Sequence, residues 1–154
     1  MREILFRGKG ANNGKWIEGS LVKVTINGLA FHLIFADDFE FNGISAKAKQ
    51  HCCVDPSTIG QYTGLTDKNG KKIFEGDIIK THYANAVKCE FVETVVFHNG
   101  KFCGENSLVG GGKAWATLWD GVPHVRLDKT VYMDEVEVIG DIHDNPELLE
   151  VDNG

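Results

Sequence analysis

The stretch GLTDKNGKKIFEGDIIK, residues 64–80, contains the strongest indications of the fold. Three glycines, an Asn-Gly pair and a Gly-Asp pair interrupt short apolar runs, and four lysines lie among them. Asn69 and Gly70 tolerate the positive φ angles of a tight hairpin turn, so we expect a turn there. Gly76 and Asp77 predict a second turn, held by hydrogen bonds from backbone N–H groups to the Asp77 side chain. The stretch therefore predicts β-strands joined by tight turns.

Two loop motifs that bind ions or phosphates do not fit the sequence. DKNG at 67–70 resembles the start of a calcium loop, but that loop needs its glycine at position 6, and Gly70 falls at position 4. VGGGK at 109–113 resembles the end of a G-x-x-x-x-G-K-[ST] phosphate loop. Ser107 replaces its first glycine, and Ala114 follows the lysine. We therefore interpret both segments as turns or loops without a bound ligand.

The rest of the chain indicates one mostly β domain spanning residues 1–154. Its 154 residues suit a single domain, and 18 glycines with only 3 prolines indicate many tight turns. An Asn-Gly pair at 27–28 follows a strand in which Val22, Val24 and Ile26 point to one side. A second pair, at 99–100, separates two further strands. About seven to nine short antiparallel strands, with one or two short helical segments, close most readily as a small barrel or a sandwich.

Two segments show helical alternatives. Residues 37–58 fit either one short strand and a loop or a single helical turn through Ala46 to Gln50. DNPELLE at 144–150 predicts a short terminal helix, with Asn145 as the N-cap and Pro146 at the first helical position.

The net charge of −6 is concentrated at the C-terminal end. The segment 134–154 holds eight acidic residues and no Lys or Arg, which leaves 14 acidic against 16 basic residues in the remainder. The body of the protein could therefore face a polyanion such as a nucleic acid. The alternative is an ordinary solvated surface of mixed charge.

A basic and aromatic group in the opening stretch is the candidate nucleic-acid site. Surfaces that bind single strands combine lysines along the phosphates with aromatic rings on which bases stack. Acidic residues in the same stretch weaken this field, and the charge pattern favours the alternative of a solvated hairpin of alternating charge. The candidate residues are Lys68, Lys71, Lys72, Lys80 and Tyr62.

Cysteines and histidines give no recognised catalytic or metal motif. The four cysteines lack C-x-x-C spacing, and none of the six histidines has H-x-x-x-H spacing. A zinc site built from distant residues, such as His51 with Cys53, Cys89 or Cys103, is the alternative to free core thiols. The sequence also lacks a G-x-S-x-G nucleophile motif. We expect no enzymatic activity, metal or cofactor, and we expect a cytoplasmic location, because we see no signal peptide or membrane span.

Three blocks of the sequence resemble the YopX protein family of bacteriophages and prophages of Gram-positive bacteria. The longest is IGQYTGLTDKNGKKIFEGDIIK at 59–80. REILFRGKGANNGKWIEGSLV at 2–22 is similar to the family's Arg-x-Ile-x-Phe-Arg opening and its following Trp-x-x-Gly. VEVIGDIHDNPELLE at 136–150 resembles the family's closing block. The segment 103–124 matches no motif of the family.

The resemblance implies a β-rich fold with an SH3-like barrel or roll, oligomer formation and no known catalytic residues. In such a barrel, Gly76 and Asp77 would redirect the chain into a strand, and the apolar residues around them would fill the interior: Ile73, Phe74, Ile78 and Ile79. We therefore expect a non-catalytic phage or prophage accessory protein in the host cytoplasm, acting as a protein-interaction or self-assembling module. The alternatives are a DNA-binding module that uses the lysine-rich hairpin 64–80 and an uncharacterised enzyme.

Overall fold

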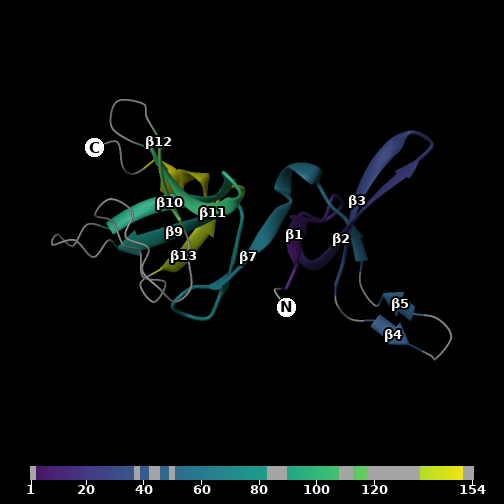
Figure 1. Cartoon of the computed structure of the whole chain (residues 1–154). Helices are drawn as coiled ribbons and strands as arrows, with labels where there is room; N and C mark the ends of the chain where they lie inside the picture. Colours follow the sequence, from purple (N-terminus) through teal and green to yellow (C-terminus); the bar gives the residue numbers. More distant parts are fainter. Residues whose placement is uncertain are drawn as a thin grey trace. The chain divides into compact units, whose positions relative to one another are not determined.

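The fold is mostly β, as the sequence predicts (Figure 1). The computed structural model describes residues 3–36, 39–41, 46–48, 51–82, 90–107, 113–117 and 136–150. The chain forms two compact units, Met1–Tyr62 and Thr63–Gly154. Within the described ranges, the helical segments are two 3-10 turns, η1 (Pro56–Thr58) and η3 (Pro146–Leu149). The prediction that the whole chain behaves as one domain stays a prediction.

The first unit is built on antiparallel strands in the order β6-β3-β2-β1-β7. β7 continues past Tyr62 into the second unit, where it neighbours β8 (Lys72–Phe74). A separate pair joins β4 to β5. The strands of this unit are β1 (Phe6–Lys9), β2 (Trp16–Ile26), β3 (Leu29–Phe35), β4 (Phe39–Phe41), β5 (Ala46–Ala48), β6 (His51–Cys53) and β7 (Gly60–Thr66).

β2 is a long strand that changes partner at Gly19. Its first part, up to Gly19, pairs with β1, and its second part, from Ser20 to Ile26, pairs with β3. A Cβ atom at Gly19 would overlap the carbonyl oxygen of Phe35. Only glycine lets β3 approach this closely, and the change of partner frees the far part of β2 to form a hairpin with β3.

The core of the first unit lies on one face of this sheet. Ile17, Ile34 and Val54 are buried there. Partly buried side chains complete the cluster: Phe6, Leu21, Cys52 and Ile59. This burial anchors the base of the β2–β3 hairpin, because Leu21 pairs with Ile34 across the two strands.

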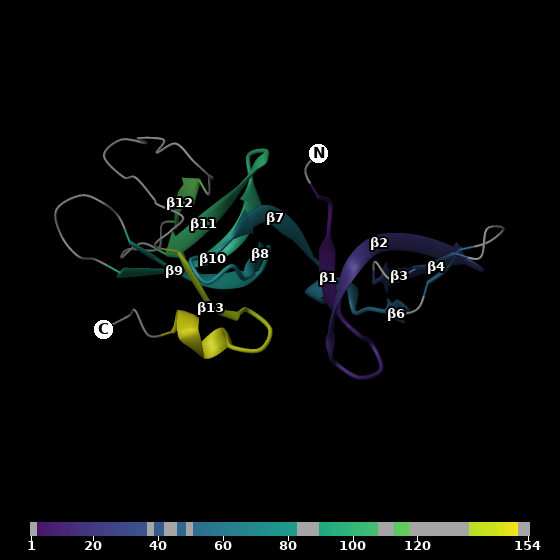
Figure 2. The same cartoon turned by 90° about the horizontal axis from the view of Figure 1, so that it is seen from below.

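The second unit contains a five-stranded antiparallel sheet in the order β12-β11-β10-β9-β13 (Figure 2). Its strands are β9 (Asp77–His82), β10 (Glu90–His98), β11 (Lys101–Ser107), β12 (Lys113–Thr117) and β13 (Glu137–Asp141). β13 carries a register shift between Val138 and Gly140. The buried cluster consists of Ile73, Ile79, Val95, Phe102, Val136 and Val138, with Leu65 packed against it.

The structure confirms the Asn-Gly hairpin turns. Asn27 and Asn99 have φ angles of 51° and 49°, and the glycines that follow them both have φ of 80°. The predicted burial around the Gly-Asp turn is also confirmed, since Ile73, Phe74, Ile78 and Ile79 are all at most 2% exposed. The terminal helical turn begins at Pro146 after Asn145, as predicted, and is a 3-10 turn.

Two finer predictions have a different outcome. A helical turn through Ala46 to Gln50 is wrong for Ala46–Ala48, which form strand β5 by pairing with β4. The SH3-like barrel is not confirmed, because the described strands form open sheets rather than a closed barrel. Cys89, residues 109–112 of the VGGGK loop, and both ends of the acidic segment 134–154 lie outside the described residues.

Candidate functional surfaces

Asp67 organises the turn of the lysine-rich hairpin. Its Oδ1 atom accepts hydrogen bonds from the backbone N–H groups of Asn69 at 2.8 Å and Lys71 at 2.9 Å. Its Oδ2 atom accepts a third, from the Val138 N–H at 3.0 Å, 71 residues along the chain. The Lys68 N–H also donates to the Val136 carbonyl oxygen at 2.9 Å. The turn is therefore hydrogen-bonded to β13 and to Val136 before it. These bonds pair backbone groups at that edge of the sheet.

The environment of Asp67 keeps its carboxyl group ionised. Burial alone would raise the pKa of Asp67, but hydrogen bonds from the Val138, Lys71 and Asn69 backbone N–H groups outweigh it and hold the pKa below its usual range. The D-x-N-G pattern of a turn is visible in the sequence. The bond to Val138 is not, because it joins residues that are far apart in the chain.

The lysines predicted to bind nucleic acid occupy different positions in the second unit. Lys68 forms an ion pair with Glu137 of β13, although its side chain is still 40% exposed. Lys71 is exposed on the same turn, whereas Lys72 in β8 and Lys80 in β9 are half-buried. The structure thus brings Lys68 and Lys71 together on one turn.

Tyr62 belongs to the first unit and is buried. The residue is 7% exposed, which leaves little open surface on which a base could stack. Nucleic-acid binding by this group of residues stays a prediction.

The Gly-Asp turn has a structural role in this fold. Gly76 has φ of +83°, and Gly70 in the neighbouring turn has φ of +80°. Asp77 is buried, and its Oδ2 atom accepts a hydrogen bond from the Phe74 N–H at 2.7 Å. The Gly76 N–H donates to the Val95 carbonyl oxygen at 2.8 Å, which ties the turn to β10. These contacts position β8 and β9.

A buried carboxylate lies within the sheet of the second unit. Glu93 of β10 is 2% exposed, and its Oε2 atom accepts a hydrogen bond from the Thr81 hydroxyl at 3.0 Å. A Cβ atom at Gly104 would lie 2.5 Å from that same oxygen, so the glycine makes room for the carboxylate. The sequence gives no signal for this pair, because an alternating strand pattern does not predict a buried glutamate.

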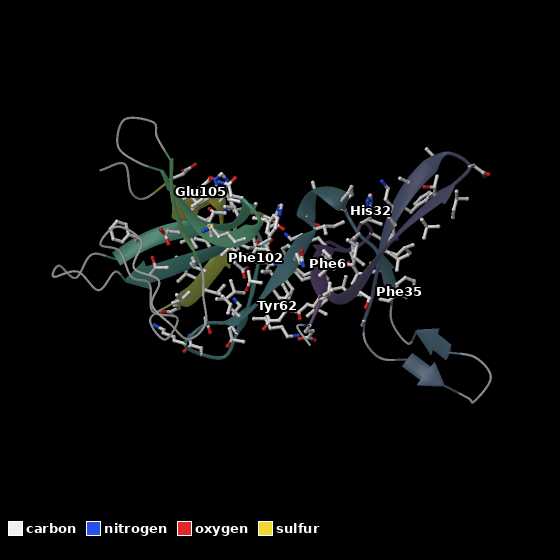
Figure 3. All side chains as sticks on the ribbon, viewed as in Figure 1. Phe6, His32, Phe35, Tyr62, Phe102 and Glu105 are labelled. Atoms are coloured by element: carbon white, nitrogen blue, oxygen red, sulfur yellow. The ribbon has the colours of Figure 1, made fainter. Side chains whose placement is uncertain are left out.

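The far part of the β2–β3 hairpin presents an exposed, entirely apolar face. Three cross-strand pairs make up this surface, which we call the hairpin face: Val22 with Leu33, Val24 with Phe31, and Ile26 with Leu29. Leu29 is 65% exposed, Ile26 55%, Val22 41% and Phe31 37%. The opposite face of the hairpin is mainly polar, with His32 paired to Lys23 (Figure 3). The predicted orientation of Val22, Val24 and Ile26 to one side is confirmed, but their exposure was not predicted.

The thiols and histidines do not assemble a metal site in the described part of the chain. Cys52, Cys53 and Cys103 are not joined in disulfides. Among the residues that the structure describes, no group of three or more His, Cys, Asp or Glu side chains could hold a metal ion. None of the helical segments described has the length and apolar character needed to span a bilayer.

These features define a mostly β protein of two units. It has a lysine-rich turn hydrogen-bonded to β13 and a hairpin with an exposed apolar face. The family model for the YopX protein matches residues 5–150, so the chain belongs to the YopX family. A solved structure, protein EF1440 from Enterococcus faecalis, is similar with a TM-score of 0.55 and 23% sequence identity, covering 97% of this chain and 99% of that chain. A search among curated proteins gives no match. The structural likeness shows the shared fold.

Proposed function

We propose that this YopX family member is a non-catalytic accessory protein of a phage or prophage, acting in the host cytoplasm as a protein-interaction or self-assembling module. The observation that carries the proposal is the hairpin face. Soluble monomers rarely expose contiguous apolar patches larger than a few hundred Å², and patches above this size mark interaction surfaces. The hairpin face gathers six apolar side chains on two adjacent strands, four of them more than one-third exposed.

The position of the hairpin face favours binding over a role in the core. The core of the first unit is formed at the base of the hairpin, around Ile34 and Val54. The far part of the hairpin extends beyond β1 (Figures 1 and 2). Its apolar residues therefore add little to the stability of the isolated unit. Covering them with a partner would remove apolar surface from water, which is favourable.

The experiment that tests this proposal compares Leu29→Lys, on the hairpin face, with Thr25→Lys on the opposite face. Both positions are exposed, so both variants are expected to fold. Wild type and Thr25→Lys should associate with themselves in sedimentation or capture a protein partner from a host extract. Leu29→Lys should do neither. The proposal is wrong if the wild type is a strict monomer and captures nothing that Leu29→Lys does not also capture.

A DNA-binding module is the second candidate, and the exposed turn that carries Lys68 and Lys71 favours it. Two exposed lysines on one turn can contact phosphates of a nucleic acid. The nearby ion pair with Glu137 reduces the field of Lys68. Binding of this kind would be strongly weakened by salt, which separates it from association through the hairpin face.

A further inference from the structure

Two cations meet one aromatic ring on the paired strands β1 and β2 of the first unit. The strands place Lys9 opposite Trp16, and Arg7 opposite Glu18. The guanidinium carbon of Arg7 lies 4.6 Å from the centroid of the Trp16 ring, and the Nζ atom of Lys9 lies 5.4 Å from it. Both distances are within the ~6 Å range of a cation–π interaction. We call Arg7, Lys9 and Trp16 the Trp16 cluster.

Hydrogen bonds fix the backbone that carries the Trp16 cluster. The Lys9 N–H donates to the Thr58 hydroxyl oxygen at 2.8 Å, and the Lys9 carbonyl oxygen accepts from the Asp55 N–H at 2.9 Å. Where the chain turns from β1 into β2, the Gly10 N–H donates to the Lys15 carbonyl oxygen at 2.9 Å. Side chains on paired strands are positioned more precisely than side chains on loops. The cluster is therefore arranged before any ligand arrives.

The side chains of the Trp16 cluster differ in exposure. Arg7 is buried and orients the ring, whereas Lys9 and Trp16 are half-buried and keep part of their surface open to solvent. One cation is enough for a stabilising contact with a ring, and two like charges held at the same ring repel each other. Glu18 offsets one of these charges, but residues 3–36 carry four Lys or Arg against two Glu. The cluster therefore concentrates positive charge beside an accessible aromatic ring, as anion-binding surfaces do.

We propose that the Trp16 cluster binds a short segment of a single-stranded nucleic acid, a function that goes beyond protein interaction. A base stacks on the open part of the Trp16 ring, and Lys9 contacts a neighbouring phosphate. Single strands offer both groups, because their unpaired bases can stack on aromatic side chains while their phosphates follow the cations. A duplex keeps its bases stacked inside, so it offers the cluster only phosphates. The site lies in the first unit, whereas the turn with Lys68 and Lys71 lies in the second.

Fluorescence anisotropy of a labelled oligothymidine tests this inference on the full-length chain. The probe is a single strand of about 10 nucleotides, titrated from about 50 mM to about 200 mM salt. Lys9→Gln should reduce the slope of log affinity against log salt by about 0.7, the contribution of one phosphate contact on a single strand. Trp16→Leu should weaken binding about 10-fold or more, because a stacked base is lost, and Trp16→Phe should weaken it less. Lys23→Gln, which removes an exposed lysine farther along β2, is the matched control and should bind like the wild type.

Three results would overturn the inference: a wild type that does not bind the oligonucleotide at low salt, a Lys9→Gln variant that binds like the wild type, or equal affinity for a duplex of the same length. The indole N–H resonance of Trp16, identified by its absence in Trp16→Phe, gives a readout on the wild type itself. It should shift when the oligonucleotide is added, and an unchanged resonance would also overturn the inference.

The same titration separates the Trp16 cluster from the other two surfaces. Leu29→Lys, on the hairpin face, should bind the oligonucleotide like the wild type, and so should the variant in which Lys68 and Lys71 are replaced with glutamate. Binding that is lost in either variant but kept in Lys9→Gln would assign it to another surface and overturn the inference. The proposed function does not depend on this result, because it is tested by self-association and protein capture.

Discussion

Replacing Asp67 with alanine should destabilise the second unit, because this carboxylate accepts three backbone hydrogen bonds. The Val138 N–H lies in a buried bond, and leaving it without an acceptor costs about 1–3 kcal/mol. The N–H groups of Asn69 and Lys71 belong to an exposed turn, where water replaces the acceptor at a cost of about 0.5–1 kcal/mol each. We therefore expect Asp67→Ala to lower the free energy of unfolding by about 2–5 kcal/mol.

Urea denaturation followed by circular dichroism measures this loss, and amide hydrogen exchange locates it. Exchange at the Val138 amide should accelerate more than exchange at amides of the first unit. Lys68→Met is the matched control, since it removes only an exposed ion pair and should cost less than about 1 kcal/mol. If Asp67→Ala unfolds within about 0.5 kcal/mol of the wild type, the reasoning about Asp67 is refuted.

The lowered pKa of Asp67 gives this prediction a pH dependence. A carboxyl group whose pKa is lower in the folded state stabilises the fold above its unfolded pKa of 3.8. That contribution is lost as the pH falls through the folded value. The stability difference between wild type and Asp67→Asn should therefore be constant near neutral pH and shrink below about pH 4. A difference that grows on acidification would contradict the assignment.

Three further predictions follow from the described contacts. Gly19→Ala should lower the free energy of unfolding by more than about 2 kcal/mol, because the new methyl group overlaps backbone of β3. A thermal unfolding midpoint equal to that of the wild type would refute this. Thr81→Val should lower the free energy of unfolding in urea by about 1–3 kcal/mol, because the buried Glu93 side chain loses a hydroxyl donor. An unchanged urea midpoint would count against this role of Thr81. If the protein binds DNA, replacing Lys68 and Lys71 with glutamate should reduce the slope of log affinity against log salt for duplex DNA by about 2. A wild type that does not bind DNA at low salt would exclude the DNA-binding function.

Local features of the fold could be predicted from the sequence. Asn27 and Asn99 adopt positive φ before glycine because the turn chemistry is contained in two adjacent residues. The alternation of Val22, Val24 and Ile26 likewise follows from the period of a strand. The three blocks that resemble the YopX family predicted the family correctly, because they span both units of the chain.

Features that depend on distant residues could not be predicted. Gly19 is required by the approach of β3, and Asp67 is fixed by a strand 71 residues away. Periodicity assigned the two faces of the hairpin but gave no information on which face the core covers. For this reason the sequence predicts a site in the lysine-rich stretch and does not predict the exposed hairpin face.

The central claim is that the hairpin face is an interaction surface, and hydrogen exchange at low and high protein concentration tests its self-assembling form most directly. Amide exchange is measured for residues 22–33 at about 10 μM and about 1 mM, in wild type and in Leu29→Lys. The account predicts that exchange in this segment slows at the higher concentration in the wild type only. Rates that are equal at both concentrations, or a slowing that persists in Leu29→Lys, would contradict it.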